Sequence, residues 1–119
     1  MKVKVHELEG VALDWAVAKL RGVALSQVPL KQMLKTYGVL RLRHGALYSP
    51  STEWAQGGPI VEQEQLQLMH MWDRGGWSAM RYDNMRSVSG PNPLTAAMRC
   101  YVMNRVDGEI DVPNELLCA

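Results

Sequence analysis

The strongest helix signal in the chain is Pro91-Asn92-Pro93-Leu94-Thr95-Ala96-Ala97-Met98-Arg99-Cys100-Tyr101-Val102. Asn92 is the predicted N-cap, and Pro93 takes the first helical position, where its missing N–H is not needed. Apolar side chains then recur at helical spacing along one stripe, which is formed by Leu94, Ala97, Met98, Tyr101, Val102 and Val106. A helix is therefore predicted from Pro93 to the turn at Asp107-Gly108.

Short strands are predicted on both sides of this helix. Residues 66–72 and 77–82 are strand-like runs joined by the glycine turn 73–76, which predicts a hairpin. Residues 109–112 alternate acidic and apolar side chains and form a closing strand, and residues 2–5 alternate Lys and Val and form an opening one.

Two further helices are predicted in the first third of the chain. Residues 11–21 are apolar nearly all round and end at Gly22, so this helix must be covered on more than one side, by the core and by a second layer or subunit. Pro29 opens a shorter helix that ends at Gly38, and residues 39–43 then alternate as a strand.

The hairpin and the short terminal strands favour antiparallel pairing over parallel βαβ units. The predicted fold class is α+β, with a small antiparallel sheet and two to three helices packed on one face. At 119 residues, the chain is expected to form a single domain over residues 1–119.

The charge and cysteine content exclude several classes of protein. The formal charge of +1 argues against non-specific nucleic-acid binding. Cys100 and Cys118 have neither the number nor the spacing of a disulfide framework or a zinc site, and both are expected to be free thiols. Charges interrupt every apolar run at the N-terminus, so we expect no signal peptide, no membrane anchor and a cytoplasmic location.

The usual catalytic sets are missing from the sequence. His6, His44 and His70 lie far apart, with no neighbouring ligand at metal-binding spacing. Glu62 and Glu64 are two residues apart, so on a helix they point in different directions. No nucleophile elbow or phosphate-binding loop occurs, although a triad can also assemble from scattered residues. We therefore expect no cofactor, no metal and no catalytic residue.

The segment from Tyr48 to Pro59 is the most unusual stretch, and it is predicted to be a long loop. Aromatic faces stack on planar rings, hydroxyl and amide groups bond to polar edges, and glycines let backbone N–H groups approach an anion. These properties suggest a site for a small nucleotide-like ligand, made by Tyr48, Ser49, Ser51, Thr52, Trp54, Gln56, Gly57 and Gly58. The structural alternative is a packed loop in which Ser51 or Thr52 caps a turn and Trp54 fills the core.

Two residues outside this segment have two interpretations each. Arg99 either faces water or, if its helix borders the segment, joins the ligand site and pairs with a phosphate. Trp15 is either buried under the second helix or part of an interface with another subunit or protein.

Three stretches together resemble the NinX-like phage proteins, a family of small proteins of unknown function from tailed phages and prophages. They are residues 13–18 (Leu-Asp-Trp-Ala-Val-Ala), residues 48–60 (Tyr-Ser-Pro-Ser-Thr-Glu-Trp-Ala-Gln-Gly-Gly-Pro-Ile), and residues 93–100 with 111–116. Residues 23–47 fit the pattern poorly. The resemblance implies a phage-encoded accessory protein acting in the cytoplasm of an infected bacterium.

Three functions follow as hypotheses. The first is a protein that sequesters a nucleotide-like ligand without turnover, which would suit a role against host defence. The second is an adaptor that binds a host or phage protein through Trp15, and a homo-oligomer is the alternative use of that face. The third is an enzyme with Glu53 or His44 as the base. Arg41, Arg43 and His44 have two interpretations. They form a surface for specific DNA binding, or they are the solvent-exposed face of a short strand.

Overall fold

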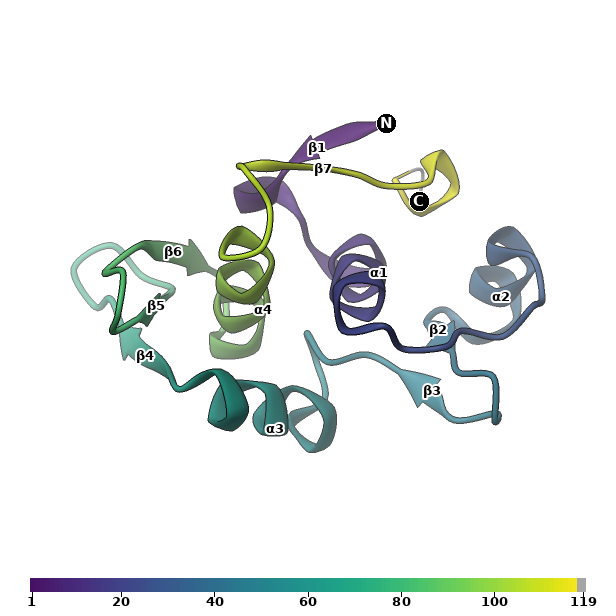
Figure 1. The fold of residues 1–119 in the computed structure, drawn as a ribbon, viewed down its shortest axis with the longest axis horizontal. Helices are drawn as coiled ribbons and strands as arrows, with labels where there is room; N and C mark the ends of the chain where they lie inside the picture. Colours follow the sequence, from purple (N-terminus) through teal and green to yellow (C-terminus); the bar gives the residue numbers. More distant parts are fainter. Residues whose placement is uncertain (118–119) are drawn as a thin grey trace.

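The predicted central helix is present in the computed structural model, which describes residues 1–117 (Figure 1). Helix α4 spans Pro93–Met103, with Pro93 in its first turn as predicted. The Asn92 side chain caps it by accepting a hydrogen bond of 2.9 Å from the backbone N–H of Thr95. Residues 94–102 are all buried, so α4 is covered on every side and forms the centre of the core.

A three-stranded antiparallel sheet covers one side of α4 (Figure 1). Its strands are β4 (Leu66–His70), β5 (Trp77–Arg81) and β6 (Ser87–Gly90), paired in the order β4-β5-β6. The hairpin β4–β5 is confirmed, whereas β6 was not predicted. Gly90 is required where β6 meets the helix, because a Cβ there would lie 2.7 Å from the backbone nitrogen of Ala96.

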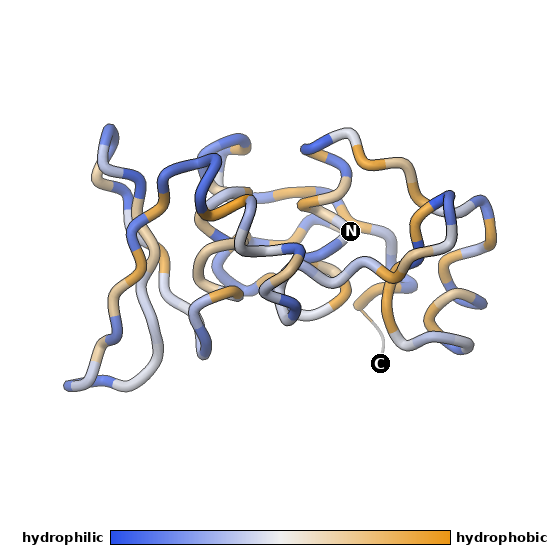
Figure 2. The backbone as a smooth tube through the Cα atoms, turned by 90° about the horizontal axis from the view of Figure 1, so that it is seen from below, coloured by the Kyte–Doolittle hydropathy of each residue, from blue (hydrophilic) through white to orange (hydrophobic). Residues whose placement is uncertain are grey.

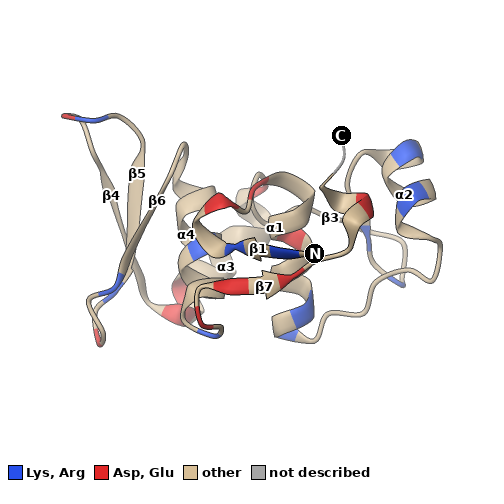
Figure 3. Cartoon of the chain, turned by 90° about the horizontal axis from the view of Figure 1, so that it is seen from above, with Lys and Arg blue, Asp and Glu red and all other residues tan. Residues whose placement is uncertain are grey.

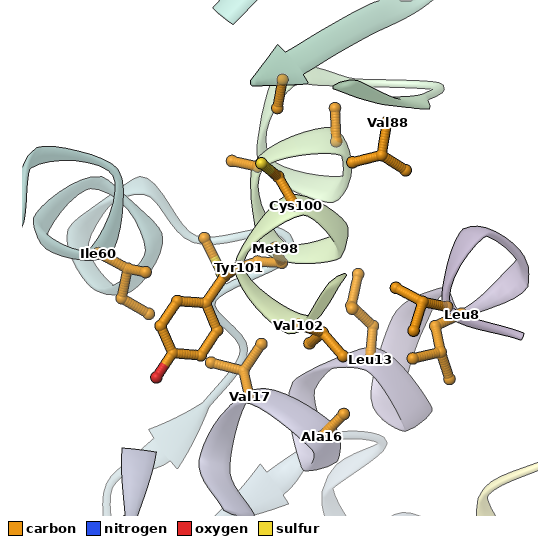
Figure 4. Close-up of a cluster of buried hydrophobic side chains, with 14 of the residues drawn as sticks. Leu8, Leu13, Ala16, Val17, Ile60, Val88, Met98, Cys100, Tyr101 and Val102 are labelled. Atoms are coloured by element: carbon orange, nitrogen blue, oxygen red, sulfur yellow. The ribbon is translucent and has the colours of Figure 1, made fainter. Parts of the chain in front are cut away.

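Helix α1 (Gly10–Arg21) packs on α4 from another side and is covered on two faces, as its apolar pattern predicted. Its first face meets α4 in the main cluster, where Leu13 and Val17 lie against Tyr101 and Val102 (Figure 4). Its second face enters a smaller cluster of buried residues, which consists of Ala18, Met33, Leu40 and Tyr48. The second layer is thus supplied by the same chain.

The smaller cluster is closed by α2 (Leu30–Tyr37) and by a two-stranded antiparallel sheet of β2 (Leu40–Arg41) and β3 (Leu47–Tyr48). The predicted glycines Gly22 and Gly38 end α1 and α2 in the left-handed conformation. The expected strand over residues 39–43 is present but shorter.

The two ends of the chain pair with each other. Strand β1 (Lys2–Lys4) is antiparallel to β7 (Glu109–Asp111), so lysines lie opposite carboxylates on this ribbon. Single-turn helices η1 (Val5–Glu7) and η2 (Asn114–Leu116) follow the two strands. The predicted terminal strands are confirmed.

The α+β class with small antiparallel sheets is confirmed, although the strands of residues 1–117 form three small sheets rather than one. One local prediction is wrong, because residues 48–59 are not a long loop. Helix α3 (Trp54–Glu64) begins inside this segment and continues past Pro59. Pro59 only removes the hydrogen bond to residue 55, and the helix survives because it packs against α4.

Candidate functional site

A buried carboxylate joins α1 to the turn that follows β3. Asp14 is 2% exposed, and it accepts hydrogen bonds from the backbone N–H of Ser51 (2.8 Å) and from the Ser49 hydroxyl (3.3 Å). Burial raises the pKa of Asp14 to about 6, and the Ser51 N–H and the Ser49 hydroxyl oppose that rise. The Ser51 hydroxyl is also buried, and it has no hydrogen-bond partner within residues 1–117. The sequence placed Asp14 in the mostly apolar helix 11–21 and in the motif 13–18, but did not predict that its carboxylate is buried.

The other polar groups of the segment 48–59 are also bonded within the protein. The Gln56 side chain accepts from the N–H of Ser49 and donates to the carbonyl of Leu47, both at 2.6 Å. The Thr52 hydroxyl bonds to the Ser49 hydroxyl, and the N–H groups of Thr52 and Glu53 donate to the Ser49 carbonyl. These bonds form a turn that starts α3.

The glycine pair of the segment lies inside α3. The N–H of Gly57 donates to the carbonyl of Glu53 at 2.8 Å, so it is already used by the helix. A Cβ at Gly57 would lie 2.3 Å from the carbonyl oxygen of Pro50 and 2.7 Å from the Leu94 side chain. Gly57 therefore allows close packing of α3. At Gly58, by contrast, an added Cβ would meet only the Trp54 ring, at 3.9 Å.

The two aromatic residues of the segment have different surroundings. Tyr48 is 7% exposed inside the smaller cluster, and burial raises the pKa of its hydroxyl. Trp54 is 54% exposed at the start of α3, so the structural alternative in which it fills the core is wrong. Of this pair, Trp54 is the ring that a ligand can reach.

Arg99 is buried, at 9% exposure, rather than facing water. Its Nε donates to the carbonyl of Leu8 at 2.7 Å, and one terminal nitrogen donates to the carbonyl of Ser89 at 2.9 Å. Burial lowers its pKa, and the carboxylate of Glu9 opposes this shift. These contacts join α4 to η1 and β6. The polar residues between Ser49 and Gln56 instead bond to one another and to Asp14, and not to Arg99.

Trp15 lies between the two hydrophobic clusters and packs against both. It is partly buried, and Lys19 lies over its ring at 5.8 Å. This position agrees with the first of the two interpretations, in which Trp15 is covered by the layer that contains the second helix.

The outer face of the sheet β4-β5-β6 contains a second group of available side chains. Its register aligns Gln67, Met80 and Ser87 in one row and Met69, Ser78 and Ser89 in the next. A hollow of about 1180 Å³ lies over this face and the hairpin turn, lined by Gln67, Leu68, Met69, His70, Met71, Trp72, Asp73, Arg74, Gly75, Ser78, Met80, Ser87, Val88 and Ser89. Trp72 is 90% exposed and Met69 is 62% exposed.

Charge is distributed unevenly over this sheet. Acidic and basic residues lie toward its ends, at the hairpin turn and near the turn between β5 and β6 (Figure 3). The hydropathy trace shows the same division, with the most hydrophilic segments at the turns (Figure 2). The sequence predicted the hairpin, but its periodicity did not identify the outer face as a site.

The groups considered for catalysis or DNA binding are dispersed or already bonded. His70 contacts the Trp77 ring at 5.1 Å, and Arg41 donates to the carbonyl of Gly45 and the hydroxyl of Tyr37. Within residues 1–117, no group of three or more His, Cys, Asp and Glu side chains is arranged to hold a metal ion. Cys100 is a buried free thiol, as expected, while Cys118 lies outside the described residues.

Fold and surface together define a small α+β protein built around one buried helix, with an open sheet face of serine, glutamine and methionine side chains and a hydrogen-bonded polar turn. The chain belongs to the family described as "Bacteriophage P22, NinX", whose model matches residues 4–105. This span includes residues 23–47, which were expected to fit poorly. The protein is therefore a phage accessory protein. No curated protein matches the chain, and no helix within the described residues has the length and apolar character needed to span a membrane.

Proposed function

We propose that this phage protein is a non-enzymatic adaptor that binds a protein partner on the outer face of the sheet β4-β5-β6. The observation that carries the proposal is the hollow over this face, with Trp72 and Met69 exposed beside it. The partner is still a protein, as in the adaptor hypothesis drawn from the sequence. The proposed contact surface is now the sheet instead of the face that contains Trp15.

The composition of the hollow supports a protein partner. Protein interfaces are enriched in Trp, Met and Arg and depleted in Lys, Glu, Asp and Ser. The hollow fits the first part of this rule and departs from the second, because Asp73 and three serines also line it. The hollow is lined by Trp72, Arg74 and three methionines, and none of its described lining residues is Lys or Glu. Methionine side chains adapt their shape to different partners, and a tryptophan on an exposed turn can bury a large apolar area.

The backbone of this face is also held in place. Its inner side packs on α4, and Leu66, Ala79 and Val88 are buried there. A rigid face loses little conformational freedom when a partner binds, which favours affinity. The face is therefore both available and preorganised.

Site-specific photo-crosslinking in phage-infected bacteria tests this proposal. A photoreactive residue at Ser78, in the centre of the outer face, is expected to form one adduct of defined mass with a protein. The control places the same residue at Lys31, which is exposed on α2. Equal labelling from both positions, or adducts from Lys31 alone, would contradict the adaptor function.

Sequestration of a nucleotide-like ligand, with a role against host defence, is the second candidate function. The observation in its favour is the exposed Trp54 ring, which leaves one stacking surface free in the segment 48–59. Native mass spectrometry is expected to show a bound nucleotide that is released intact on denaturation and lost in Trp54→Ala. A released product instead of the intact ligand would indicate an enzyme.

A further inference from the structure

Strand edges are covered in most of this fold. The outward backbone groups of β3 bond to the Gln56 side chain, which contacts the Leu47 carbonyl and the Ser49 N–H. On β2, the Arg41 carbonyl accepts from the N–H of Ser26, and the Arg41 N–H donates to the sulfur of Met33. Covering an edge in this way prevents unwanted pairing with other strands.

The remaining edge strands are shorter than β4, and contacts or charge limit access to them. Strand β6 is four residues long and lies against η1, and its Ser89 carbonyl accepts a hydrogen bond from Arg99. Strands β1 and β7 are three residues long and carry Lys2, Lys4, Glu109 and Asp111. Short length and charged side chains both discourage edge-to-edge association.

Strand β4 is different. It is the other edge of the three-stranded sheet, it is five residues long, and its sequence Leu-Gln-Leu-Met-His contains no Lys, Arg, Asp, Glu or Pro. The backbone groups of successive residues in an antiparallel strand point alternately toward and away from the neighbouring strand. The N–H of Met71, directly after β4, donates to the carbonyl of Gly76, directly before β5. Gln67 and Met69 therefore face β5, and Leu68 and His70 direct their backbone groups away from the sheet. Within residues 1–117, those outward groups have no hydrogen-bond partner.

We propose that β4 pairs with β4 of a second copy of this chain, antiparallel and about a twofold axis, to form a dimer with a continuous six-stranded sheet. An antiparallel edge is complementary to itself, because each copy presents the same alternation of N–H and carbonyl groups. With Leu68 opposite Leu68 of the second copy, each His70 lies opposite a Leu66, so the imidazoles stay apart.

The absence of Lys, Arg, Asp and Glu on β4 favours a second copy as the occupant of this edge. Pairing about a twofold axis brings each strand against its own sequence, so any charged side chain would face a like charge, and β4 avoids that repulsion. The dimer also extends the outer face, because each exposed Met69 then lies near the twofold axis. This inference goes beyond the adaptor function and does not depend on it.

Sedimentation velocity of the full chain at increasing concentration tests the dimer. Wild type is expected to reach twice the monomer mass, and His70→Pro is expected to remain a monomer. Proline at this position removes only an outward N–H, which is where an edge strand tolerates it. The control His70→Val also loses the imidazole but keeps the N–H, and it is expected to dimerise. A wild type that stays monomeric at every concentration, or a dimeric His70→Pro, would overturn the proposal.

Amide hydrogen exchange provides a second test if His70→Pro does not fold. The N–H groups of Leu68 and His70 are expected to exchange slowly in concentrated wild-type protein and quickly after dilution. Fast exchange of both at all concentrations would contradict the pairing. Trp72→Ser separates the two proposals, because it is expected to lose the protein partner and keep the dimer.

Discussion

The segment 48–59 and the sheet β4-β5-β6 differ in what they leave free. The segment is rich in hydroxyl, amide and glycine groups, yet Gln56, Thr52 and Gly57 bond or pack within the protein. The sheet has a plainer composition, and its outer face and its β4 edge are open. The composition of a segment therefore does not indicate which of its groups are available to a partner.

Hydrogen-bond partners explain why most polar groups of this segment are occupied within the protein. A buried polar group is costly unless it is bonded, so the turn around Ser49 and Asp14 has to be satisfied internally. Apolar groups on a sheet face have no such requirement and can remain exposed until a partner covers them. Four substitutions test this contrast.

Gly57→Ala should have the largest effect. Its Cβ would overlap the Pro50 carbonyl, so we expect the free energy of unfolding to fall by about 3 kcal/mol. The matched control Gly58→Ala meets only the Trp54 ring and should stabilise α3 by up to about 1 kcal/mol. Urea denaturation of both variants gives the comparison. Equal effects at the two positions would show that close packing of α3 does not depend on Gly57.

Asp14 should make the stability depend on pH. Its pKa is about 6 in the folded protein and near 3.8 when unfolded, so the folded state binds more protons between these values. The free energy of unfolding should therefore rise as pH falls from 7 toward 4, and this gain is lost as pH rises through 6. The full difference is about 3 kcal/mol.

The matched variant for this prediction is Asp14→Asn, which keeps an oxygen that can accept from Ser51 but does not titrate. Urea denaturation near pH 4.5 and near pH 7.5 should show that the variant lacks this part of the pH dependence. The same pH slope in both proteins would mean that Asp14 is not the responsible group.

Gln56→Ala should have an intermediate effect. It removes two hydrogen bonds to the backbone of β3, and the freed groups can reach water, so we expect a loss of about 1–2 kcal/mol. Gln67→Ala, on the open sheet face, should change the free energy of unfolding by less than about 0.5 kcal/mol. Thermal or urea denaturation of the two variants tests whether Gln56→Ala lowers the free energy of unfolding more than Gln67→Ala does.

Trp72→Ser should have the smallest effect on folding. Its side chain is 90% exposed, so the free energy of unfolding should change by less than about 0.5 kcal/mol. A large loss of stability, measured by urea denaturation, would mean that Trp72 is a structural residue and not an available contact.

Local signals explain what the sequence could predict. The cap at Asn92 and the apolar stripe located α4, and the glycine turn located the hairpin. Helix α3 was missed because Gly57, Gly58 and Pro59 indicate a loop, whereas packing against α4 maintains the helix. Strand β6 was missed because it contains a single large apolar residue, Val88.

Contacts between distant residues explain what the sequence could not predict. Asp14 is bonded to Ser49 and Ser51, 35 and 37 residues away, and Arg99 is bonded to Leu8 across 91 residues. Neither partner can be found from periodicity or spacing. The acidic residue alone in the apolar run 11–18 was the available signal for Asp14, and the motif at residues 13–18 contains it.

Native mass spectrometry of protein purified from phage-infected bacteria tests most directly whether the sheet is the binding surface. Wild type, Trp72→Ser and Trp54→Ala would be compared under the same conditions. We expect a stoichiometric protein partner with wild type and Trp54→Ala, and its loss with Trp72→Ser. Loss of a bound partner or small molecule in Trp54→Ala, with full retention in Trp72→Ser, would contradict the account and return the binding site to the segment 48–59.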